Sequence, residues 1–250
     1  MSEFDGIRAL VTGGGSGIGA ATAAELLTRG AHVAVLDLRP ETAPDGAHRL
    51  QCDLGDPASV TAAVARAVES MGGLDVVVNN AGIGAQGDVT ANSDEEWHRV
   101  LDIDVVAIAR VVREALPHLR RSEHAAIVNV ASIAATAGLP DRVLYSAAKG
   151  AVLSMTLAMA ADHVREGIRV NAVNPGTANT PWVQNLLDKA DDPEAERAAL
   201  NARQPHKRLV EAEEIAGAIC YLASPLSGST TGTALAVDGG MQGLRLRPEA

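Results

Sequence analysis

Ile7-Arg8-Ala9-Leu10-Val11-Thr12-Gly13-Gly14-Gly15-Ser16-Gly17-Ile18-Gly19 determines the architecture that this sequence can adopt. The apolar run from Ile7 to Thr12 predicts a buried strand, and the helix-forming residues from Ala20 to Arg29 predict a helix that Gly30 ends. Glycines at a strand-to-helix turn allow the backbone to approach a pyrophosphate, which then lies at the helix N-terminus. A glycine-rich turn alone is also typical of a flexible loop, but here both flanks favour the phosphate-binding interpretation.

The alternation of short apolar runs and helix-forming segments continues along the chain. Further strands are predicted at Ala31 to Leu36, His48 to Gln51, Leu74 to Val78, Ala125 to Val130, Ile168 to Val173 and Thr233 to Val237. This alternation predicts a Rossmann-like, doubly wound parallel α/β sheet of about seven strands, with helices on both faces. We expect a single domain over residues 1–250, with a ligand at the carboxyl ends of the strands.

The composition argues against several classes of protein. The 250 residues have a formal net charge of −10, which disfavours nucleic acid or an anionic membrane surface as a partner. Met1 to Asp5 lack the basic and apolar regions of a signal peptide, and no uninterrupted apolar run reaches membrane-spanning length. Two cysteines, Cys52 and Cys220, cannot build a disulfide framework. We therefore expect a cytoplasmic protein, and we predict no metal site.

Acidic residues after the predicted strands suggest how a dinucleotide is held. Asp37 ends the second strand, where a carboxylate can accept both ribose hydroxyls of the adenosine half and repel the extra phosphate of NADP. The sequence therefore predicts NAD, although a solvated loop aspartate is the simpler alternative. Asp53, beside Leu54, can accept from an adenine amino group, or it can belong to the N-cap region of the helix from Pro57 to Met71.

Another group of residues indicates acid–base chemistry. Tyr145 and Lys149 are four residues apart in a segment of helix formers, so they share one face of the predicted helix. A fixed cation beside a phenol favours the phenolate, which can take a proton from an alcohol. Ser132 follows the strand that ends at Val130, and its hydroxyl can hold the same substrate oxygen. Without the rest of the chain, the tyrosine and lysine would be more typical of an ordinary helix surface.

Over nearly its whole length the sequence resembles the short-chain dehydrogenase/reductase family. The matching motifs are Thr12-Gly13-x-x-x-Gly17-Ile18-Gly19, Asn79-Asn80-Ala81-Gly82, Ser132, Tyr145-x-x-x-Lys149 and Pro175-Gly176 with Thr180. The resemblance implies a nicotinamide cofactor and hydride transfer at a carbon that bears oxygen. It also implies that Tyr145 is the acid/base, that Ser132 positions the substrate oxygen and that Lys149 binds the nicotinamide ribose.

The resemblance further implies that Thr180 lies near the carboxamide and that the protein is a homodimer or homotetramer. The predicted cofactor-binding residues come from the turns at the strand ends and from the predicted catalytic helix. They are Gly13, Ser16, Gly17, Ile18, Gly19, Asp37, Asp53, Leu54, Asn80, Ala81, Gly82, Tyr145, Lys149, Pro175, Gly176 and Thr180.

One position departs from the family pattern. The family usually has an asparagine seven residues after a tryptophan, and here Asp104 stands at that distance from Trp97. An aspartate keeps the acceptor oxygens, lacks the amide donor and adds a charge that favours the ammonium form of Lys149. Asp104 is therefore a further catalytic candidate, and a solvent-facing helix carboxylate is an equally good interpretation.

The segment 177–209 is polar and proline-containing, and we expect it to be an insertion that covers the site as a lid. Of the chain's one Phe, two Tyr and two Trp, only Trp182 lies in this segment, which disfavours a long apolar substrate. Arg142 and Arg203 resemble positions that hold a carboxylate in the family's hydroxy-acid dehydrogenase branch, and guanidinium groups suit that task. Alternatively, both arginines pair with nearby acids on the surface.

These observations predict an NAD-dependent oxidoreductase that acts on a small hydroxy acid or a sugar-derived acid. Arg142, Trp182 and Arg203 are the predicted substrate contacts. A neutral-sugar dehydrogenase and an NADH-dependent reductase of 3-oxoacyl-type carbonyls remain open alternatives, because the sequence does not fix the substrate or the direction of reaction. A dinucleotide-binding sensor without turnover is the alternative outside enzymology, although the intact Ser132, Tyr145 and Lys149 argue against it.

Overall fold

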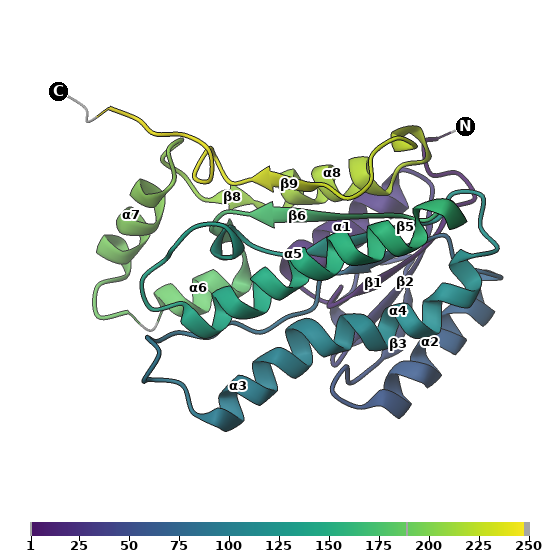
Figure 1. Cartoon of the computed structure of the whole chain (residues 1–250), viewed down its shortest axis with the longest axis horizontal. Helices are drawn as coiled ribbons and strands as arrows, with labels where there is room; N and C mark the ends of the chain where they lie inside the picture. The colour runs from purple at the N-terminus through teal and green to yellow at the C-terminus, as the bar shows by residue number, and fades with distance from the viewer. Residues whose placement is uncertain (1, 189, 248–250) are drawn as a thin grey trace.

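The computed structural model describes residues 2–188 and 190–247 and is built around a seven-stranded parallel sheet (Figure 1). The strands lie in the order β3-β2-β1-β4-β5-β6-β9. Their bounds are β1 Arg8–Thr12, β2 His32–Asp37, β3 His48–Gln51, β4 Val76–Asn79, β5 Ala126–Val130, β6 Arg169–Pro175 and β9 Ala234–Val237. The order reverses between β1 and β4, which opens a crevice at the carboxyl ends of these strands. The predicted doubly wound fold is confirmed.

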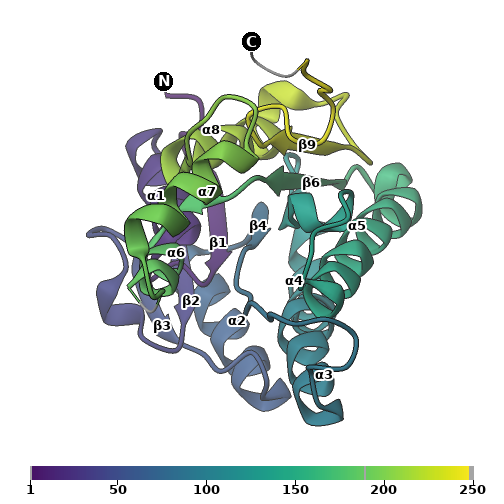
Figure 2. The ribbon, with the colours of Figure 1, turned by 90° about the vertical axis from the view of Figure 1, so that its left-hand side faces the viewer.

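Helices cover both faces of the sheet, as the end-on view of Figure 2 shows. On one face α1 (Gly17–Thr28) packs beside α8 (Ala212–Ala223), and on the other lie α2 (Pro57–Met71), α4 (Ala107–Leu119) and α5 (Val143–His163). Strands buried on both faces need apolar residues at every position. In β4, Val76 and Val78 enter the core beneath α1 and α8, while Val77 enters the opposite core.

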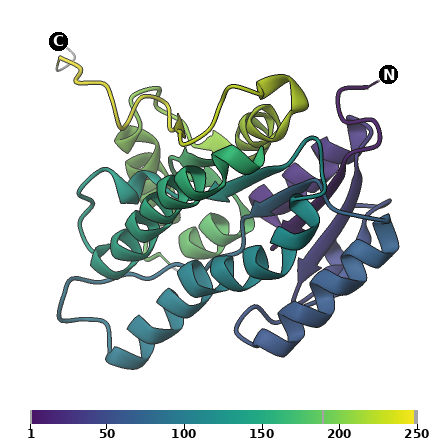
Figure 3. The same ribbon diagram turned by 45° about the vertical axis from the view of Figure 1, so that its right-hand side comes forward.

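The long helical run before β5 contains a local change of helix type. Helix α3 (Asp94–Leu101) continues through a π-helical turn, η2 (Asp102–Val106), into α4, and Figure 3 shows this run beside α5. The π turn places an extra residue in the helix near Asp104 without ending it. Proline normally ends a helix, but α4 accommodates Pro117 and continues to the fully buried Leu119.

The segment 177–209 forms two helices beyond the carboxyl ends of the central strands (Figure 1). Helices α6 (Pro181–Leu187) and α7 (Pro193–Arg203) share a small buried cluster of Val183, Leu187, Leu200 and Leu209. A short parallel pair that the sequence did not reveal, β7 (Ala178–Asn179) and β8 (Val210–Glu211), joins the two ends of the segment. The remaining elements are the 3₁₀ turns η1 Pro40–Thr42, η3 Ile133–Ala135, η4 Val164–Glu166 and η5 Pro225–Ser227.

Helix α5 and the turn after it, Val143–Glu166, are long and apolar enough to pass a test for a membrane span, with a mean hydropathy of 1.4. The sequence predicted no such segment, because Lys149 interrupts its apolar residues. Core helices pass the same test on length and composition. Here Ala148 and Val152 are fully buried, and the helix packs along β6. These contacts indicate a core helix that covers the sheet.

Candidate active site

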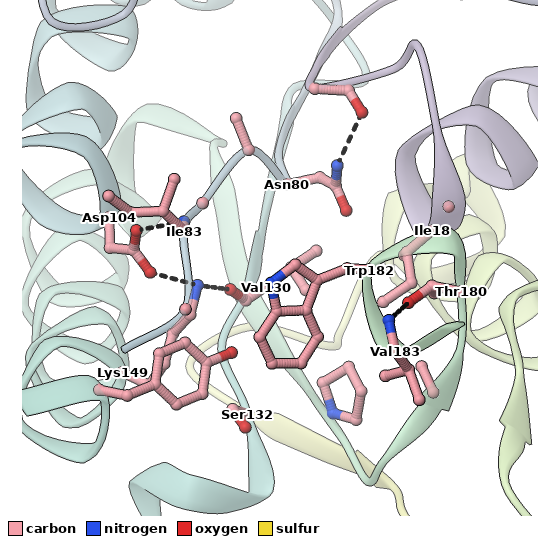
Figure 4. A pocket seen from close by; sticks show the side chains of 18 of the residues that line it. Ile18, Asn80, Ile83, Asp104, Val130, Ser132, Lys149, Thr180, Trp182 and Val183 are labelled. Carbon is pink, nitrogen blue, oxygen red and sulfur yellow. Dashed lines mark hydrogen bonds and ion pairs between the residues drawn. The ribbon is translucent and has the colours of Figure 1, made fainter. Parts of the chain in front are cut away.

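A cavity of about 480 Å³ lies in the crevice at the carboxyl ends of the central strands. Figure 4 shows side chains from the sheet edge, α5 and the 177–209 segment around this cavity. Every predicted site residue except Gly19 lines it. These are Gly13, Ser16, Gly17, Ile18, Asp37, Asp53, Leu54, Asn80, Ala81, Gly82, Asp104, Ser132, Arg142, Tyr145, Lys149, Pro175, Gly176, Thr180, Trp182 and Arg203.

The glycine turn between β1 and α1 lies close to the loop that follows β4. Gly13 has a φ of 66°, and a Cβ atom there would come within 2.9 Å of the Ala81 Cα atom, so a side chain would not fit. Gly19 lies behind the turn, where a Cβ atom would collide with the Gly13 carbonyl. The glycines therefore bring two loops together and leave the N-terminus of α1 facing the cavity.

Two polar side chains hold this pair of loops together. The Thr12 hydroxyl oxygen accepts from the backbone N–H groups of Asn80 and Ala81 at 3.0 and 3.1 Å. The Asn80 side-chain amide donates to the carbonyls of Thr12 and Gly13 at 3.0 and 3.2 Å. Asn80 thus lines the cavity as predicted, but its amide braces the loops. Thr12 is not among the predicted site residues, because its hydrogen bonds to the loop after β4 form only in the folded chain.

Asp37 lies at the end of β2 and is half-buried. Its carboxylate accepts from the backbone N–H groups of Gly15 and Arg39, both at 2.9 Å. Two carboxylate oxygens offer about four acceptor sites, so room remains for further donors. Asp53 accepts from the Gly55 N–H at 2.9 Å, whereas the N-cap of α2 is Asp56. The cap interpretation of Asp53 is therefore wrong, and its side chain borders the cavity.

Ser132, Tyr145 and Lys149 meet at the same side of the cavity. Ser132 follows β5, and its hydroxyl oxygen caps the 3₁₀ turn η3 by accepting from the Ala134 N–H at 3.1 Å. The Lys149 ammonium donates to the Val130 carbonyl at 3.2 Å and lies 5.7 Å from the centre of the Tyr145 ring. The strand end and the first turns of α5 therefore bring together a hydroxyl, a phenol and an ammonium, the groups needed for proton transfer at a carbon–oxygen bond.

Asp104 is fully buried and faces Lys149 (Figure 4). One carboxylate oxygen accepts from the Ile83 N–H at 2.7 Å, and the other lies 3.2 Å from the Lys149 Nζ atom. The solvent-facing alternative for Asp104 is therefore wrong. Burial opposes the charge of Lys149, but the negative charges of Tyr145 as phenolate and of Asp104 outweigh it and raise the pKa of the ammonium.

Arg142 and Arg203 come from distant parts of the chain and line the same cavity. Arg142 donates to the Asp141 carbonyl at 2.7 Å, and within residues 2–188 and 190–247 neither arginine forms an ion pair. Burial and the nearby charge of Arg203 lower the pKa of Arg142, and the more weakly acting carboxylates of Asp141 and Glu196 offset only part of this effect. The two guanidinium groups thus lie close enough to repel each other, and the predicted alternative of surface pairing with local acids is not what the structure contains.

The 177–209 segment touches the rest of the site at two glycines. Thr180, the N-cap of α6, lies against Gly17, where a Cβ atom would be 3.3 Å from its methyl group. The Trp182 ring covers Gly84, where a Cβ atom would be 2.5 Å from the indole. These contacts place the segment over the cavity at both the glycine turn and the loop after β4.

The cavity also has an aliphatic lining that the sequence analysis did not predict. It is formed by residues such as Ile83 after β4, Leu139 before α5, and Leu186 and Leu200 of helices α6 and α7. Apolar side chains carry no chemical motif, so only the folded chain reveals that they share a wall. Near the opposite end, Leu38, Leu54 and Ile103 supply further apolar surface beside Asp37 and Asp53.

A nicotinamide dinucleotide fits these residues. The glycine turn leaves backbone N–H groups and a helix N-terminus for a pyrophosphate, and Asp37 has acceptor sites for ribose hydroxyls. Leu38, Leu54 and Ile103 offer apolar surface for an adenine, and Lys149 offers donors near Tyr145.

Comparisons with known proteins agree with this arrangement. A family model described as enoyl-(acyl carrier protein) reductase matches residues 13–242. The cis-4-hydroxycyclohexanecarboxylate dehydrogenase of Sinomonas cyclohexanicum is 42% identical over 242 residues, which cover 93% of this chain and 95% of that protein. The 2-(R)-hydroxypropyl-CoM dehydrogenase of Xanthobacter autotrophicus is 38% identical, with 92% of this chain and 96% of that protein covered.

Solved structures extend the similarity to three dimensions. The aldohexose dehydrogenase of Thermoplasma acidophilum superposes with a TM-score of 0.92 at 29% identity, and the match covers 100% of both chains. One conclusion follows from the fold, from the glycine turn, from the group formed by Ser132, Tyr145 and Lys149, and from the similarity to these relatives. This chain belongs to the short-chain dehydrogenase/reductase family and is an oxidoreductase of alcohols and carbonyls.

Proposed function

We propose that this protein is an NAD-dependent dehydrogenase of a small hydroxy acid whose hydrocarbon body is cyclic or branched. The observation that carries the proposal is the pair of arginines, Arg142 and Arg203, which line the cavity of Ser132 and Tyr145 without a carboxylate partner in the part of the chain that the structure describes. Two neighbouring guanidinium groups repel each other, so an anion between them is strongly favoured.

Asp37 supports NAD over NADP as the cofactor. Its carboxylate is fixed by the N–H groups of Gly15 and Arg39, so it cannot easily turn away from a ribose. A 2′-hydroxyl can donate to this carboxylate, whereas a 2′-phosphate would be repelled by it. Arg39 uses its backbone to hold Asp37, and its side chain is the nearest cation in the sequence that could offset the repulsion.

The proton of the alcohol would be transferred to Tyr145. The Ser132 hydroxyl would hold the substrate oxygen, while the Tyr145 oxygen removes its proton, with the Lys149 ammonium stabilising the phenolate. The nicotinamide, when bound, supplies the hydride acceptor. In the reverse direction Tyr145 returns the proton to the carbonyl oxygen, so the same residues serve oxidation and reduction.

The lining of the cavity supports the proposed shape of the substrate. Leu139, Leu186 and Leu200 provide aliphatic contacts for a compact hydrocarbon, and the arginines provide a site for its carboxylate. Holding the acid at a distance from the reacting carbon would fix the alcohol against Tyr145. The name of the 42% identical relative, cis-4-hydroxycyclohexanecarboxylate dehydrogenase, describes a substrate of this kind. Closure of the 177–209 segment over the substrate is part of this proposal.

The experiment compares an acid with its uncharged counterpart. Formation of NADH from cis-4-hydroxycyclohexanecarboxylate and from its methyl ester is measured with the wild type, Arg142→Gln and Arg203→Gln. A lost charged hydrogen bond costs about 1.5–3 kcal/mol, so KM for the acid should rise at least about tenfold in each variant, while KM for the ester changes little.

Arg197→Gln is the matched control for Arg203→Gln. Arg197 lies on the same helix, α7, but donates to the Gln184 side chain and does not line the cavity. The control should keep the wild-type KM. If Arg142→Gln and Arg203→Gln also keep it on the best acid found, the arginine pair does not bind the carboxylate and the proposed substrate class is wrong.

A neutral-sugar dehydrogenase is the second candidate, because the aldohexose dehydrogenase superposes over the whole chain. The kinetics of the wild type distinguish the sugar dehydrogenase from the hydroxy-acid dehydrogenase. A higher kcat/KM for an aldohexose than for any hydroxy acid in the same assay favours the sugar, and the opposite ranking favours the acid.

A further inference from the structure

The Lys149 ammonium is one of the most deeply buried charges in the protein. Its side chain is 6% exposed, and the groups that face it come from three elements. Tyr145 lies on the same helix, Asp104 on the π turn, and the Val130 carbonyl at the end of β5. The loop of Gly82 and Ile83 also packs here but contributes no titratable side chain. Only Tyr145 and Asp104 can offer a negative charge among these neighbours.

A phenol and a carboxylate differ in how readily they carry a negative charge near pH 7. A phenol is neutral near pH 7 unless something ionises it, whereas a carboxylate paired with an ammonium is charged. Burial alone disfavours the charged form of a lysine strongly. As long as Tyr145 keeps its proton, Asp104 is thus the one anion beside Lys149, and the Val130 carbonyl is its uncharged acceptor.

We propose that Asp104 is a positioning residue whose buried carboxylate, and not Tyr145, holds Lys149 as an ammonium ion in the resting enzyme. The carboxylate is itself fixed, because the Ile83 N–H donates to its other oxygen at 2.7 Å. Gly82 leaves the space for this pair, since a Cβ atom there would lie 3.1 Å from both the Asp104 oxygen and the Lys149 nitrogen. The cation is therefore in place beside Tyr145 before any substrate arrives.

Two acidic residues of the π turn have different partners. Asp102, two residues earlier, pairs with Arg110 at 2.6 Å, and Arg110 also donates to the Leu54 carbonyl at 3.0 Å. Asp104 points the other way, towards Ile83 and Lys149. Each residue of a helix turns the side-chain direction by about 100°, so Asp102 and Asp104, two residues apart, point to nearly opposite sides. This inference deepens the role of Lys149 in the proposed function.

The test measures the charge of Lys149 directly and needs no substrate, so it can fail independently of the proposed function. Lys149 is one of three lysines in the sequence. Protein labelled with ¹³C-lysine therefore gives few Cε signals, and Lys149→Arg identifies that of Lys149. The chemical shift of this carbon reports whether the amine is protonated as the pH is raised from 6 to 11.

In the wild type we expect Lys149 to remain an ammonium beyond pH 9. Asp104→Asn keeps the shape of the side chain but removes its charge. In this variant the midpoint of the Lys149 titration should fall by about two pH units or more. Asp94→Asn is the matched control, because it removes the same charge from the exposed start of α3 in the same helical run. It should leave the Lys149 titration unchanged. An unshifted midpoint in Asp104→Asn overturns the proposal.

A second variant keeps the proposal testable if Asp104→Asn does not fold. Tyr145→Phe removes the other potential anion and leaves Asp104 in place. The Lys149 signal should then stay at the ammonium position at pH 7–8. If Lys149 loses its proton in this range in Tyr145→Phe, the phenol and not Asp104 holds the charge, and the inference is wrong.

Discussion

The cofactor preference depends on one carboxylate, so Asp37→Asn should weaken it strongly. The substitution keeps the shape of the side chain and one acceptor oxygen for Gly15 or Arg39, but it removes the negative charge. For a carboxylate and a phosphate dianion about 5 Å apart, an effective dielectric constant of about 40 gives about 3 kcal/mol of repulsion. This dielectric constant suits a half-buried side chain at the edge of a cavity. The energy corresponds to a preference of about a hundredfold for NAD.

The assay measures kcat/KM with NAD and with NADP at one ionic strength, because salt screens this repulsion. The wild type should prefer NAD by about a hundredfold or more, and Asp37→Asn should reduce the ratio to below about tenfold, chiefly by improved use of NADP. Asp45→Asn is the control, because Asp45 is a fully exposed carboxylate paired with Arg49. Comparable efficiency of the wild type with both cofactors would refute the role assigned to Asp37.

Two further predictions concern the catalytic lysine and the acid stability of the fold. Gly82→Ala should lower kcat about tenfold with little change in Tm. The new Cβ atom would lie 3.1 Å from the Asp104 oxygen and the Lys149 nitrogen and would force this ion pair to move. An unchanged kcat would show that the ion pair tolerates the extra methyl group without moving. In Glu214, a hydrogen bond from Arg208 and one from the Glu211 N–H lower the pKa to about 2. Because this pKa is depressed on folding, the stabilisation by Glu214 is complete above about pH 4.5 and is lost as the pH falls towards 2. Glu214→Gln should therefore lower Tm at pH 7 but have little effect at the lowest pH at which the protein stays folded, and an equal effect at both pH values would contradict this.

Much of the fold could be predicted because parallel strands buried on both faces have a simple sequence pattern. Runs such as Val76-Val77-Val78 are apolar at every position, and the regular alternation with helices predicts that the strands are parallel. The extent of α4 was harder to predict, since Pro117 normally ends a helix. Burial of Leu119 outweighs the missing hydrogen bond, and this gain depends on tertiary packing.

The chemistry-bearing residues were predictable for a related reason. Ser132, Asp37 and the glycine turn all lie at or just after the ends of strands. The carboxyl ends of parallel strands lie at the same edge of the sheet. The burial of Asp104 was not predictable, because it depends on how the π turn packs against α5 and the loop of Ile83. The bracing role of Asn80 likewise depends on two loops meeting in space. The single domain, the homo-oligomer and the cytoplasmic location stay predictions.

The central claim is that Tyr145 transfers the proton in an NAD-dependent oxidation, and Tyr145→Phe tests it most directly. The variant loses only the hydroxyl, so binding of NAD, followed by quenching of tryptophan fluorescence, should stay within about threefold of the wild type. General acid–base catalysis contributes about 10²–10⁴-fold, so kcat for the best hydroxy acid should fall by at least about a hundredfold. If Tyr145→Phe binds NAD and still turns over the acid at more than a tenth of the wild-type rate, the assignment of the catalytic group is contradicted.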